Sequence, residues 1–214
     1  MSMKISGGVE ENGVVVGNSY DKYGSKNPIV KKMMKGFKSA LSDLVLEASP
    51  LSIHEVGCGE GYWVLQWNKL GFNARGCDFS SHCIDIAKEN AIACEVSPEK
   101  FNVCSIYELD QARDKADLIV CCEVLEHLEY PEAALAALQR VVGKSLIISV
   151  PREPIWCGLN LARGKYLSQW GNTPGHLQHW SKSSFIHLVY KYFDVVKVRS
   201  PLPWTMLLCR PSAR

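Results

Sequence analysis

The stretch that decides the fold is "HEVGCGEGYWVLQW", residues 54–67, in which Gly57, Gly59 and Gly61 lie between an acidic residue and a bulky apolar run. The preceding "SPLSIHEV" has the composition of a short β-strand, and "YWVLQWNKLG" has a helical pattern that Gly71 ends. The unit is therefore strand, glycine loop and helix. In an open α/β sheet such a loop lies at the carboxyl end of its strand and presents backbone amides to a ligand. The stretch predicts a ligand site there.

Strands and helices alternate outward from this loop. Helical patterns separate the strand-like segments "ARGCD", "KFNVCSI", "ADLIVCC" and "SLIISVP", and one of them, "PEAALAALQRVV", opens at Pro131 and closes at Gly143. At the end, "DVVKVRS" and "WTMLLCR" are strands joined by a short Pro-containing turn, which makes them antiparallel. We therefore expect an α/β fold with a Rossmann-like, doubly wound, seven-stranded sheet, mostly parallel with an antiparallel last strand, and helices on both faces.

Charge and cysteine content limit the partners and the compartment. A formal net charge of +2 creates no field toward nucleic acid or acidic membranes. No apolar stretch approaches the roughly 18 residues of a membrane span, and the N-terminus lacks a signal-peptide core. The nine cysteines are odd in number and scattered, which is typical of reduced packing residues. We expect a cytoplasmic protein with no nucleic acid partner and no stable membrane insertion.

The residues around the glycine loop select the class of ligand. A dinucleotide fingerprint has its third glycine five positions after the first, but Tyr62 stands there and Gly61 comes one residue early. The Glu55 carboxylate would repel a pyrophosphate, whereas it would attract a ligand with an ammonium group, directly or through water. Asp78 ends the second strand and can accept hydrogen bonds from two ribose hydroxyls. The pattern favours a ligand with a ribose, an ammonium and a carboxylate but no phosphate.

With these motifs the sequence resembles the class I S-adenosylmethionine-dependent methyltransferases. "HEVGCGEG" is similar to their first motif, "GCDFS" to the acidic end of the second strand, "VCSIYEL" to the adenine-side turn, and "ADLIVCCEVLEHL" to the fourth strand and the helix after it. The motifs occur in the order and spacing of the family over roughly residues 20–210. "EVLEHL" and "HLQHWS" resemble the small-molecule subgroup typified by ubiquinone and menaquinone biosynthesis enzymes.

The resemblance implies a role for each matching residue toward S-adenosylmethionine and its product S-adenosylhomocysteine. Glu55 would face the amino group of the methionine part and Asp78 the ribose hydroxyls. Phe79 would cover the adenine, and Cys122 would offer its backbone carbonyl near the methionine end. The glycine loop would contact the methionine part through Gly57, Cys58, Gly59 and Gly61. Ser105 and Ile106 would flank the adenine edge, although many members carry Asp in place of the serine. Tyr20 belongs to the N-terminal segment that would close over the cofactor.

The resemblance also divides the chain. We expect a single methyltransferase domain over residues 1–214, long enough for one well-buried core. Its parts are an N-terminal arm (1–26), a cofactor-binding half (27–150), a substrate-capping insertion (151–180) and the last helix with two C-terminal strands (181–214). The arm, whose first 19 residues are rich in Gly, Ser, Asn and Glu, has the composition of a mobile or edge segment.

The candidates for the acceptor side lie mainly in the insertion. His176 and His179 are candidate general bases, together with His127, which is as well suited to fixing a helix start. Trp156 and Trp170 either cap an aromatic or apolar acceptor or form a small core of the insertion. Arg163 either binds an acidic acceptor or is simply solvated. The H-x-x-H pair has no third ligand at a suitable spacing, so we expect no metal.

The sequence predicts transfer of a methyl group from S-adenosylmethionine to an oxygen, nitrogen or carbon atom of a small-molecule acceptor. "CCEV" after the fourth strand is neither the Asn-Pro-Pro-Tyr type nor the Pro-Cys type of nucleic-acid methyltransferases. The alternatives are a nicotinamide-dependent oxidoreductase and a non-catalytic S-adenosylmethionine-binding protein on the same fold. The acceptor and the oligomeric state are left open.

Overall fold

A seven-stranded sheet forms the centre of the computed structural model, which describes residues 3–11, 14–164 and 166–212. The strand order is β5-β4-β3-β6-β7-β9-β8, and all neighbours pair in parallel except those of β9, which is antiparallel to both β7 and β8. This confirms the expected fold class. The bounds of the strands are β3 Ser52–Val56, β4 Asn73–Asp78, β5 Phe101–Val103, β6 Ala116–Cys122, β7 Val142–Pro151, β8 Phe193–Arg199 and β9 Trp204–Pro211.

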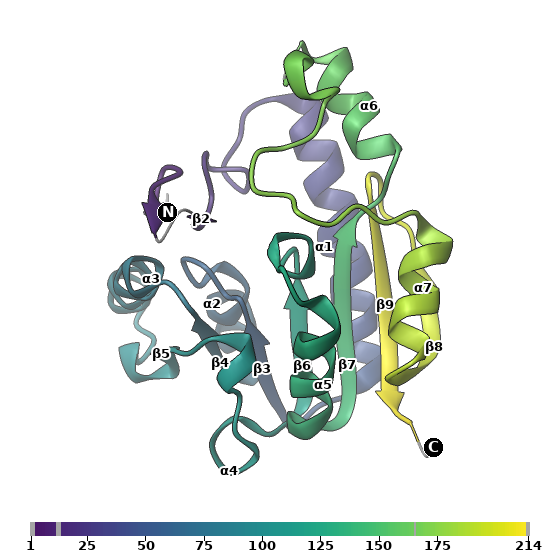
Figure 1. The fold of residues 1–214 in the computed structure, drawn as a ribbon. Coiled ribbons are helices and arrows are strands. Elements are labelled where there is room, and N and C mark those ends of the chain that lie inside the picture. The colour runs from purple at the N-terminus through teal and green to yellow at the C-terminus, as the bar shows by residue number, and fades with distance from the viewer. Residues whose placement is uncertain (1–2, 12–13, 165, 213–214) are drawn as a thin grey trace.

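Helices cover both faces of the sheet, as Figure 1 shows. The buried residues divide into two cores, one shared with α1, α2 and α3 and the other with α5 and α7. In β6 the side chains alternate between them, since Leu118 and Val120 join the first core and Ile119 and Cys121 the second. The helices are α1 Pro28–Ala48, α2 Tyr62–Lys69, α3 Ser81–Ala93, α4 Gln111–Asp114, α5 Pro131–Val141, α6 Ile155–Ala162 and α7 Lys182–Tyr190, and the 3-10 turns are η1 Pro98–Lys100, η2 Ile106–Glu108, η3 Leu125–His127 and η4 Leu167–Gln169.

The prediction that Gly143 closes a helix is wrong. Helix α5 ends at Val141, and β7 starts at the next residue, so Gly143 lies inside the strand and not at a helix cap. A Cβ atom at Gly143 would lie 2.6 Å from the carbonyl oxygen of Ala116. The glycine therefore allows β7 to approach the start of β6 closely, a packing constraint that is indistinguishable from a helix stop in the sequence.

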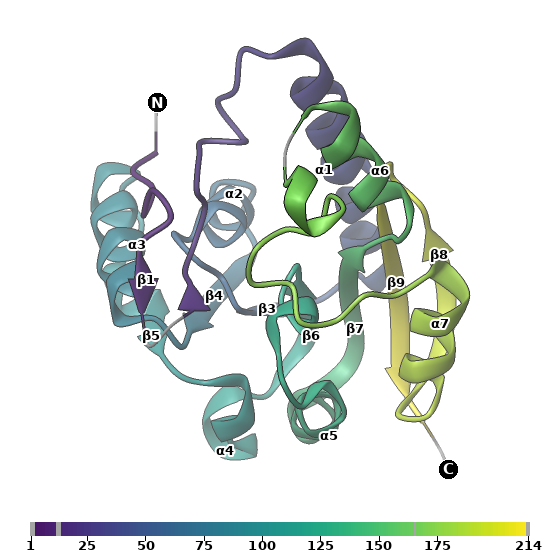
Figure 2. The same cartoon turned by 45° about the horizontal axis from the view of Figure 1, so that its top comes forward.

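The N-terminal arm and the insertion both lie at the carboxyl ends of the parallel strands (Figure 1 and Figure 2). The arm contains a short antiparallel pair, β1 Glu10–Glu11 and β2 Val14–Val15. The insertion contains α6 and η4. Residues 1–2 and 12–13 of the predicted arm lie outside the described residues. Among the helices that the structure describes, none is long and apolar enough to cross a membrane.

Candidate active site

A cavity of about 920 Å³ lies at the carboxyl ends of β3, β4 and β6. Residues of the arm and of α1 line one part of it, and residues of the insertion line another. This is the edge where an open α/β sheet binds its ligands, because the loops after β3 and β6, which leave the sheet on opposite faces, separate there. The predicted glycine loop therefore opens onto this cavity.

The glycine loop adopts a backbone that other residues rarely adopt. Gly57, Gly59 and Gly61 have φ angles of 77°, 51° and 85°. A Cβ atom on Gly57 would collide with the Val124 side chain, and one on Gly61 would lie 2.7 Å from the Phe101 ring. Gly61 packs behind the loop and does not line the cavity, whereas Gly57 and Gly59 do. The loop thus keeps its backbone open toward the cavity.

Asp78 at the end of β4 faces this loop. Its Oδ2 accepts a hydrogen bond of 2.9 Å from the Gly59 N–H, and its Oδ1 accepts one of 3.0 Å from the Ser80 N–H. The residue is 9% exposed and lines the cavity. Burial raises the pKa of Asp78, an effect that the two backbone donors oppose. Each carboxylate oxygen keeps a lone pair for a ligand hydroxyl, and the carboxylate is held in a fixed orientation.

Glu55 is a second buried carboxylate at the same edge. It is 4% exposed, and its Oε2 has no hydrogen-bond partner among the described residues. Burial raises the pKa of Glu55 well above its usual value, and the charge of Lys22 in the arm acts in the opposite direction. A buried carboxylate oxygen without a partner is costly unless a ligand supplies a donor. The side chain is therefore suited to a ligand ammonium group or a water bound to it.

The other predicted cofactor residues also border the cavity, except for Gly61. Phe79 is half-exposed, and Ile106 is buried. The Ser105 hydroxyl accepts a hydrogen bond from the Tyr107 N–H and caps η2, so it has a structural use. The predicted cofactor residues that line the cavity are Tyr20, Glu55, Gly57, Cys58, Gly59, Asp78, Phe79, Ser105, Ile106 and Cys122.

Glu60, within the glycine loop, fixes the N-terminal arm. Its Oε1 accepts hydrogen bonds from the Ser6 N–H (3.1 Å), the Ser6 hydroxyl (3.0 Å) and the Asn18 N–H (2.7 Å), and its Oε2 accepts one from the Asn18 amide (2.5 Å). A Cβ atom on Gly17 of the arm would collide with Glu60. The arm is therefore docked on the loop by close backbone contact. The sequence analysis missed Glu60, whose role requires the arm to be in place.

Two further carboxylates, Glu123 and Glu126, lie beyond the end of β6. The Ser149 hydroxyl donates to Glu123 Oε1 at 3.2 Å, and the Trp204 indole N–H donates to Glu123 Oε2. Burial raises the pKa of Glu123 to about 7, and Lys22 opposes this effect. Glu123 has a positive φ of 60°, a backbone conformation that non-glycine residues rarely adopt.

Glu126, His127 and His176 converge at the same end of the cavity. Glu126 is 1% exposed, and neither carboxylate oxygen has a hydrogen-bond partner in the described part of the chain. His127 Nδ1 lies 2.9 Å from the Gly175 carbonyl oxygen, which assigns the proton to Nδ1 and leaves Nε2 as an acceptor. Burial lowers the pKa of His176 to about 3, so its ring is neutral.

This triplet could hold a metal ion. One ligand atom from each of Glu126, His127 and His176 lies within 4.8 Å of the others. Two neutral imidazoles and a carboxylate are a donor set that suits zinc and other divalent transition metals. The sequence analysis found no third ligand because it considered His176 with His179. The informative signal was the adjacent Glu-His pair in "EVLEHL", which follows a strand end.

The structure separates the predicted acceptor-side residues into two groups. Trp156, Arg163 and the two histidines His127 and His176 line the cavity. The Trp156 ring stacks on His176 at a centroid distance of 5.9 Å. By contrast, Trp170 is 83% exposed, and exposed His179 has its Nε2 at 2.6 Å from Asn172 Oδ1. The structure does not bring Trp170 and His179 to the cavity.

Part of this chain is similar in sequence to known methyltransferases. Residues 54–147 match a family model described as a methyltransferase domain. The mitochondrial ubiquinone biosynthesis O-methyltransferase of Saccharomyces cerevisiae is 34% identical over 93 residues, which is 40% of this chain and 28% of that protein. The ubiquinone biosynthesis O-methyltransferase of Alkalilimnicola ehrlichii is 26% identical over 146 residues, which is 62% of this chain and 59% of that protein. The matched part spans about half or less of the length of most such curated relatives.

Solved structures share the fold along most of the chain. Magnesium protoporphyrin IX methyltransferase from Synechocystis PCC 6803, solved with bound SAH, superposes with a TM-score of 0.66 at 17% identity and covers 88% of this chain and 90% of its own. The PH0226 protein of Pyrococcus horikoshii has a TM-score of 0.68 at 15% identity and covers 87% of this chain and 93% of its own. At these identities the likeness concerns the fold.

Proposed function

We propose that this chain, which contains a class I S-adenosylmethionine-dependent methyltransferase domain, transfers the methyl group of S-adenosylmethionine to a small-molecule acceptor. The observation that carries the proposal is the arrangement of Asp78 and Glu55 around the open glycine loop. The same edge of the sheet supplies a fixed carboxylate for two hydroxyls and a buried carboxylate oxygen without a partner among the described residues.

The residues present fit S-adenosylmethionine. Asp78 would accept the ribose hydroxyls, and Glu55 would accept the ammonium group directly or through water. The backbone of Gly57 and Gly59 would lie along the methionine part, with Phe79 and Ile106 at the adenine. When bound, the cofactor supplies a sulfonium methyl group for in-line displacement. Gly61 comes one residue earlier than the third glycine of a dinucleotide fingerprint, so the oxidoreductase alternative is not favoured.

At the other end of the cavity, the protein has to position the acceptor and exclude water. Trp156 and Trp204 give apolar walls, and Glu123, Glu126 and the two histidines give hydrogen-bond acceptors. Positioning alone can supply effective molarities on the order of 10⁵ to 10⁸ M. Glu123, with a pKa of about 7, is better matched to accept a proton near neutral pH than His176, whose pKa is about 3.

The acceptor atom that we favour is a hydroxyl oxygen. The curated relatives described above are named O-methyltransferases, and the acceptor end offers several groups that accept a hydroxyl proton. A small, uncharged or cationic aromatic hydroxyl compound would suit the carboxylates and the tryptophans. We expect the protein to act in the cytoplasm on such a free metabolite, without a nucleic acid partner.

Calorimetric titration with S-adenosylmethionine and S-adenosylhomocysteine tests the cofactor. If the protein binds neither compound, the proposal is refuted. A screen of metabolite extracts with labelled methyl donor then tests the activity through mass gains of one methylene. Because Glu126, His127 and His176 could hold a divalent cation, the screen should be run both with added metal and with a chelator. Cofactor binding without any methylated product would favour the non-catalytic alternative.

A further inference from the structure

Two thiols lie beside the cofactor end of the cavity. Cys77 is the second-to-last residue of β4, and Cys104 directly follows β5. Both are buried and belong to the same core, the one shared with α5 and α7. Cys104 also lines the cavity, at the side where Ser105 and Ile106 lie, whereas Cys77 does not. A small molecule in the cavity can therefore reach Cys104 first.

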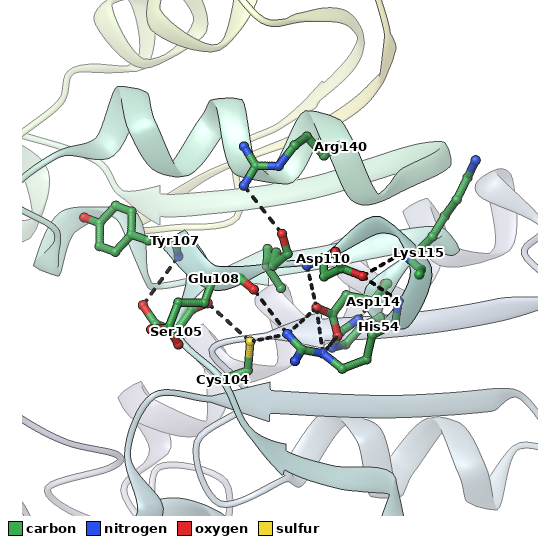
Figure 3. A network of polar contacts seen from close by, with 12 residues as sticks. His54, Cys104, Ser105, Tyr107, Glu108, Asp110, Asp114, Lys115 and Arg140 are labelled. Atoms are coloured by element: carbon green, nitrogen blue, oxygen red, sulfur yellow. Dashed lines mark hydrogen bonds and ion pairs between the residues drawn. The ribbon is translucent and has the colours of Figure 1, made fainter.

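A guanidinium group holds the Cys104 sulfur. Arg113 Nη2 donates to Cys104 Sγ at 3.1 Å and also to the Glu108 carbonyl oxygen at 3.2 Å. Its position is fixed by the Asp114 carboxylate, which accepts from Nε and Nη2 at 2.9 to 3.1 Å. Figure 3 shows Cys104 next to this network, with Glu108 and Asp114. An arginine donor at this distance stabilises the thiolate form.

The charges around Cys104 favour reactivity at that sulfur and not at its neighbour. The hydrogen bond from Cys77 and the charge of Arg113 lower the pKa of Cys104 to about 7, against burial and the carboxylates of Asp114 and Glu108. The same hydrogen bond, together with burial, raises the pKa of Cys77. The thiolate is the nucleophilic form of cysteine. The pair thus consists of a reactive sulfur and a neighbouring protonated thiol, whose proton can leave with the sulfenic hydroxyl as water when the disulfide forms.

Both cysteines also position the cofactor end through their backbones. The Cys77 carbonyl oxygen accepts hydrogen bonds from the Gly57 N–H (2.8 Å) and the Cys58 N–H (3.0 Å) of the glycine loop. The Cys104 N–H donates to the Asp78 carbonyl oxygen at 2.9 Å. A covalent bond between the two side chains would therefore join residues whose backbones hold the glycine loop and Asp78.

We propose that Cys104 and Cys77 form a peroxide-reactive thiol pair whose oxidation lowers the affinity of the neighbouring site for S-adenosylmethionine. The Cys104 thiolate attacks the O–O bond of hydrogen peroxide and becomes a sulfenic acid, and the leaving hydroxide takes a proton to form water. The Cys77 thiol then displaces the sulfenic hydroxyl, forms the disulfide and releases a second water. The cofactor effect rests on the proposed function, whereas the thiol chemistry does not.

The chemistry is tested on the reduced chain of residues 1–214 with dilute hydrogen peroxide, a cyclic 1,3-dione that traps sulfenic acids, and mass spectrometry. Cys94, which is more exposed than Cys104, is the internal comparison. We expect Cys104 to react at least about tenfold faster than Cys94, because the Arg113 guanidinium at 3.1 Å stabilises the Cys104 thiolate. The Cys77→Ala variant should accumulate trapped Cys104, and the Arg113→Gln variant should slow Cys104 by about tenfold.

The effect on the site is tested by calorimetry with S-adenosylmethionine before and after peroxide. Affinity should fall at least about tenfold on oxidation, return with reductant, and become insensitive to peroxide in Cys104→Ala but not in the matched control Cys94→Ala. In folded protein, a Cys104 that reacts no faster than Cys94, or unchanged affinity after complete oxidation, would overturn the inference. If the reduced chain binds no S-adenosylmethionine while Cys104 still reacts, the proposed function fails and the thiol pair stands.

Discussion

The two ends of the cavity are built in different ways. At the cofactor end Asp78 and Glu60 accept two and four hydrogen bonds from backbone, loop and arm donors, and Glu55 Oε2 is the exception without a partner among the described residues. At the acceptor end Glu126 is buried, and both its oxygens lack a partner among the described residues. The first end holds a preformed shape, and the second keeps hydrogen-bonding capacity in reserve.

This difference follows from the segments that build each end. The cofactor end is one strand-loop-helix unit with the strand beside it, so the backbone N–H groups of Gly59 and Ser80 lie within reach of Asp78. The acceptor end combines Lys22 of the arm, the turn after β6, Trp156 and His176 of the insertion and Trp204 of β9. Because unpartnered buried acceptors are costly, they point to a group that the ligand supplies. Substitutions at the two ends should therefore separate turnover from cofactor affinity.

The largest expected effect is on turnover at the acceptor end. His176→Ala should lower kcat by about 10²-fold, because the acceptor loses a wall and a hydrogen-bond acceptor that position it. The dissociation constant of S-adenosylmethionine should change little. His179→Ala is the matched control, since His179 lies outside the cavity and should keep normal turnover. Equal effects of the two substitutions, measured by steady-state kinetics, would remove His176 from the site.

At the cofactor end the opposite separation is expected. Asp78→Ala should weaken S-adenosylmethionine binding by about 1.5 to 3 kcal/mol, the usual contribution of hydrogen bonds to a charged group, or about 10- to 150-fold in the dissociation constant. Calorimetry measures it directly. Asp85→Ala, at an exposed position of α3, is the control. A dissociation constant that Asp78→Ala leaves unchanged would contradict the ribose assignment.

The raised pKa of Glu123 should make the stability of the protein depend on pH. The folded pKa of Glu123, about 7, lies above its ordinary value of 4.5. The native state therefore holds this proton more tightly, so its contribution is fully present below about pH 4.5 and is lost as the pH rises to about 7. The slope is at most about 1.4 kcal/mol per pH unit for one proton.

Comparison with Glu123→Gln isolates this contribution. The lowered pKa of His176 has the opposite effect, because it costs stability as the pH falls below the ordinary pKa of histidine, and both proteins contain His176. Urea denaturation of both proteins from pH 5 to 8 should show the wild type losing stability relative to Glu123→Gln as the pH rises. A constant difference between the two proteins across this range would show that Glu123 titrates normally.

The smallest expected effect tests the docking of the arm. Glu60→Gln should raise the dissociation constant of S-adenosylmethionine by about fivefold, since one of the two acceptor oxygens is lost at a cost of about 1 kcal/mol. Limited proteolysis should cut the arm faster. Glu89→Gln also removes a contact to the arm, the exposed ion pair with Lys4, and should have almost no effect. If both variants behave alike, Glu60 does not hold the arm.

Much of the cofactor end could be predicted from the sequence. Glu55, Asp78 and the glycine loop were found because short strands, tight turns and the residues at their ends are local patterns. The exception is Gly61, which packs against Phe101 and does not line the cavity. Of the residues predicted for the acceptor, His127, His176, Trp156 and Arg163 line the cavity, whereas Trp170 and His179 lie outside it. Glu123 and Glu126 line the cavity and were not predicted.

The sequence by itself determined the alternation of strands and helices, the single antiparallel strand and the position of the ligand loop, because hydrophobic periodicity and turn residues act over a few neighbours. Only the tertiary structure decided which side chains share the acceptor end, that Glu60 holds the arm, and that Arg113 meets Cys104. These contacts join residues far apart in the chain or depend on side-chain direction. They are fixed by packing and burial, which no short segment specifies alone.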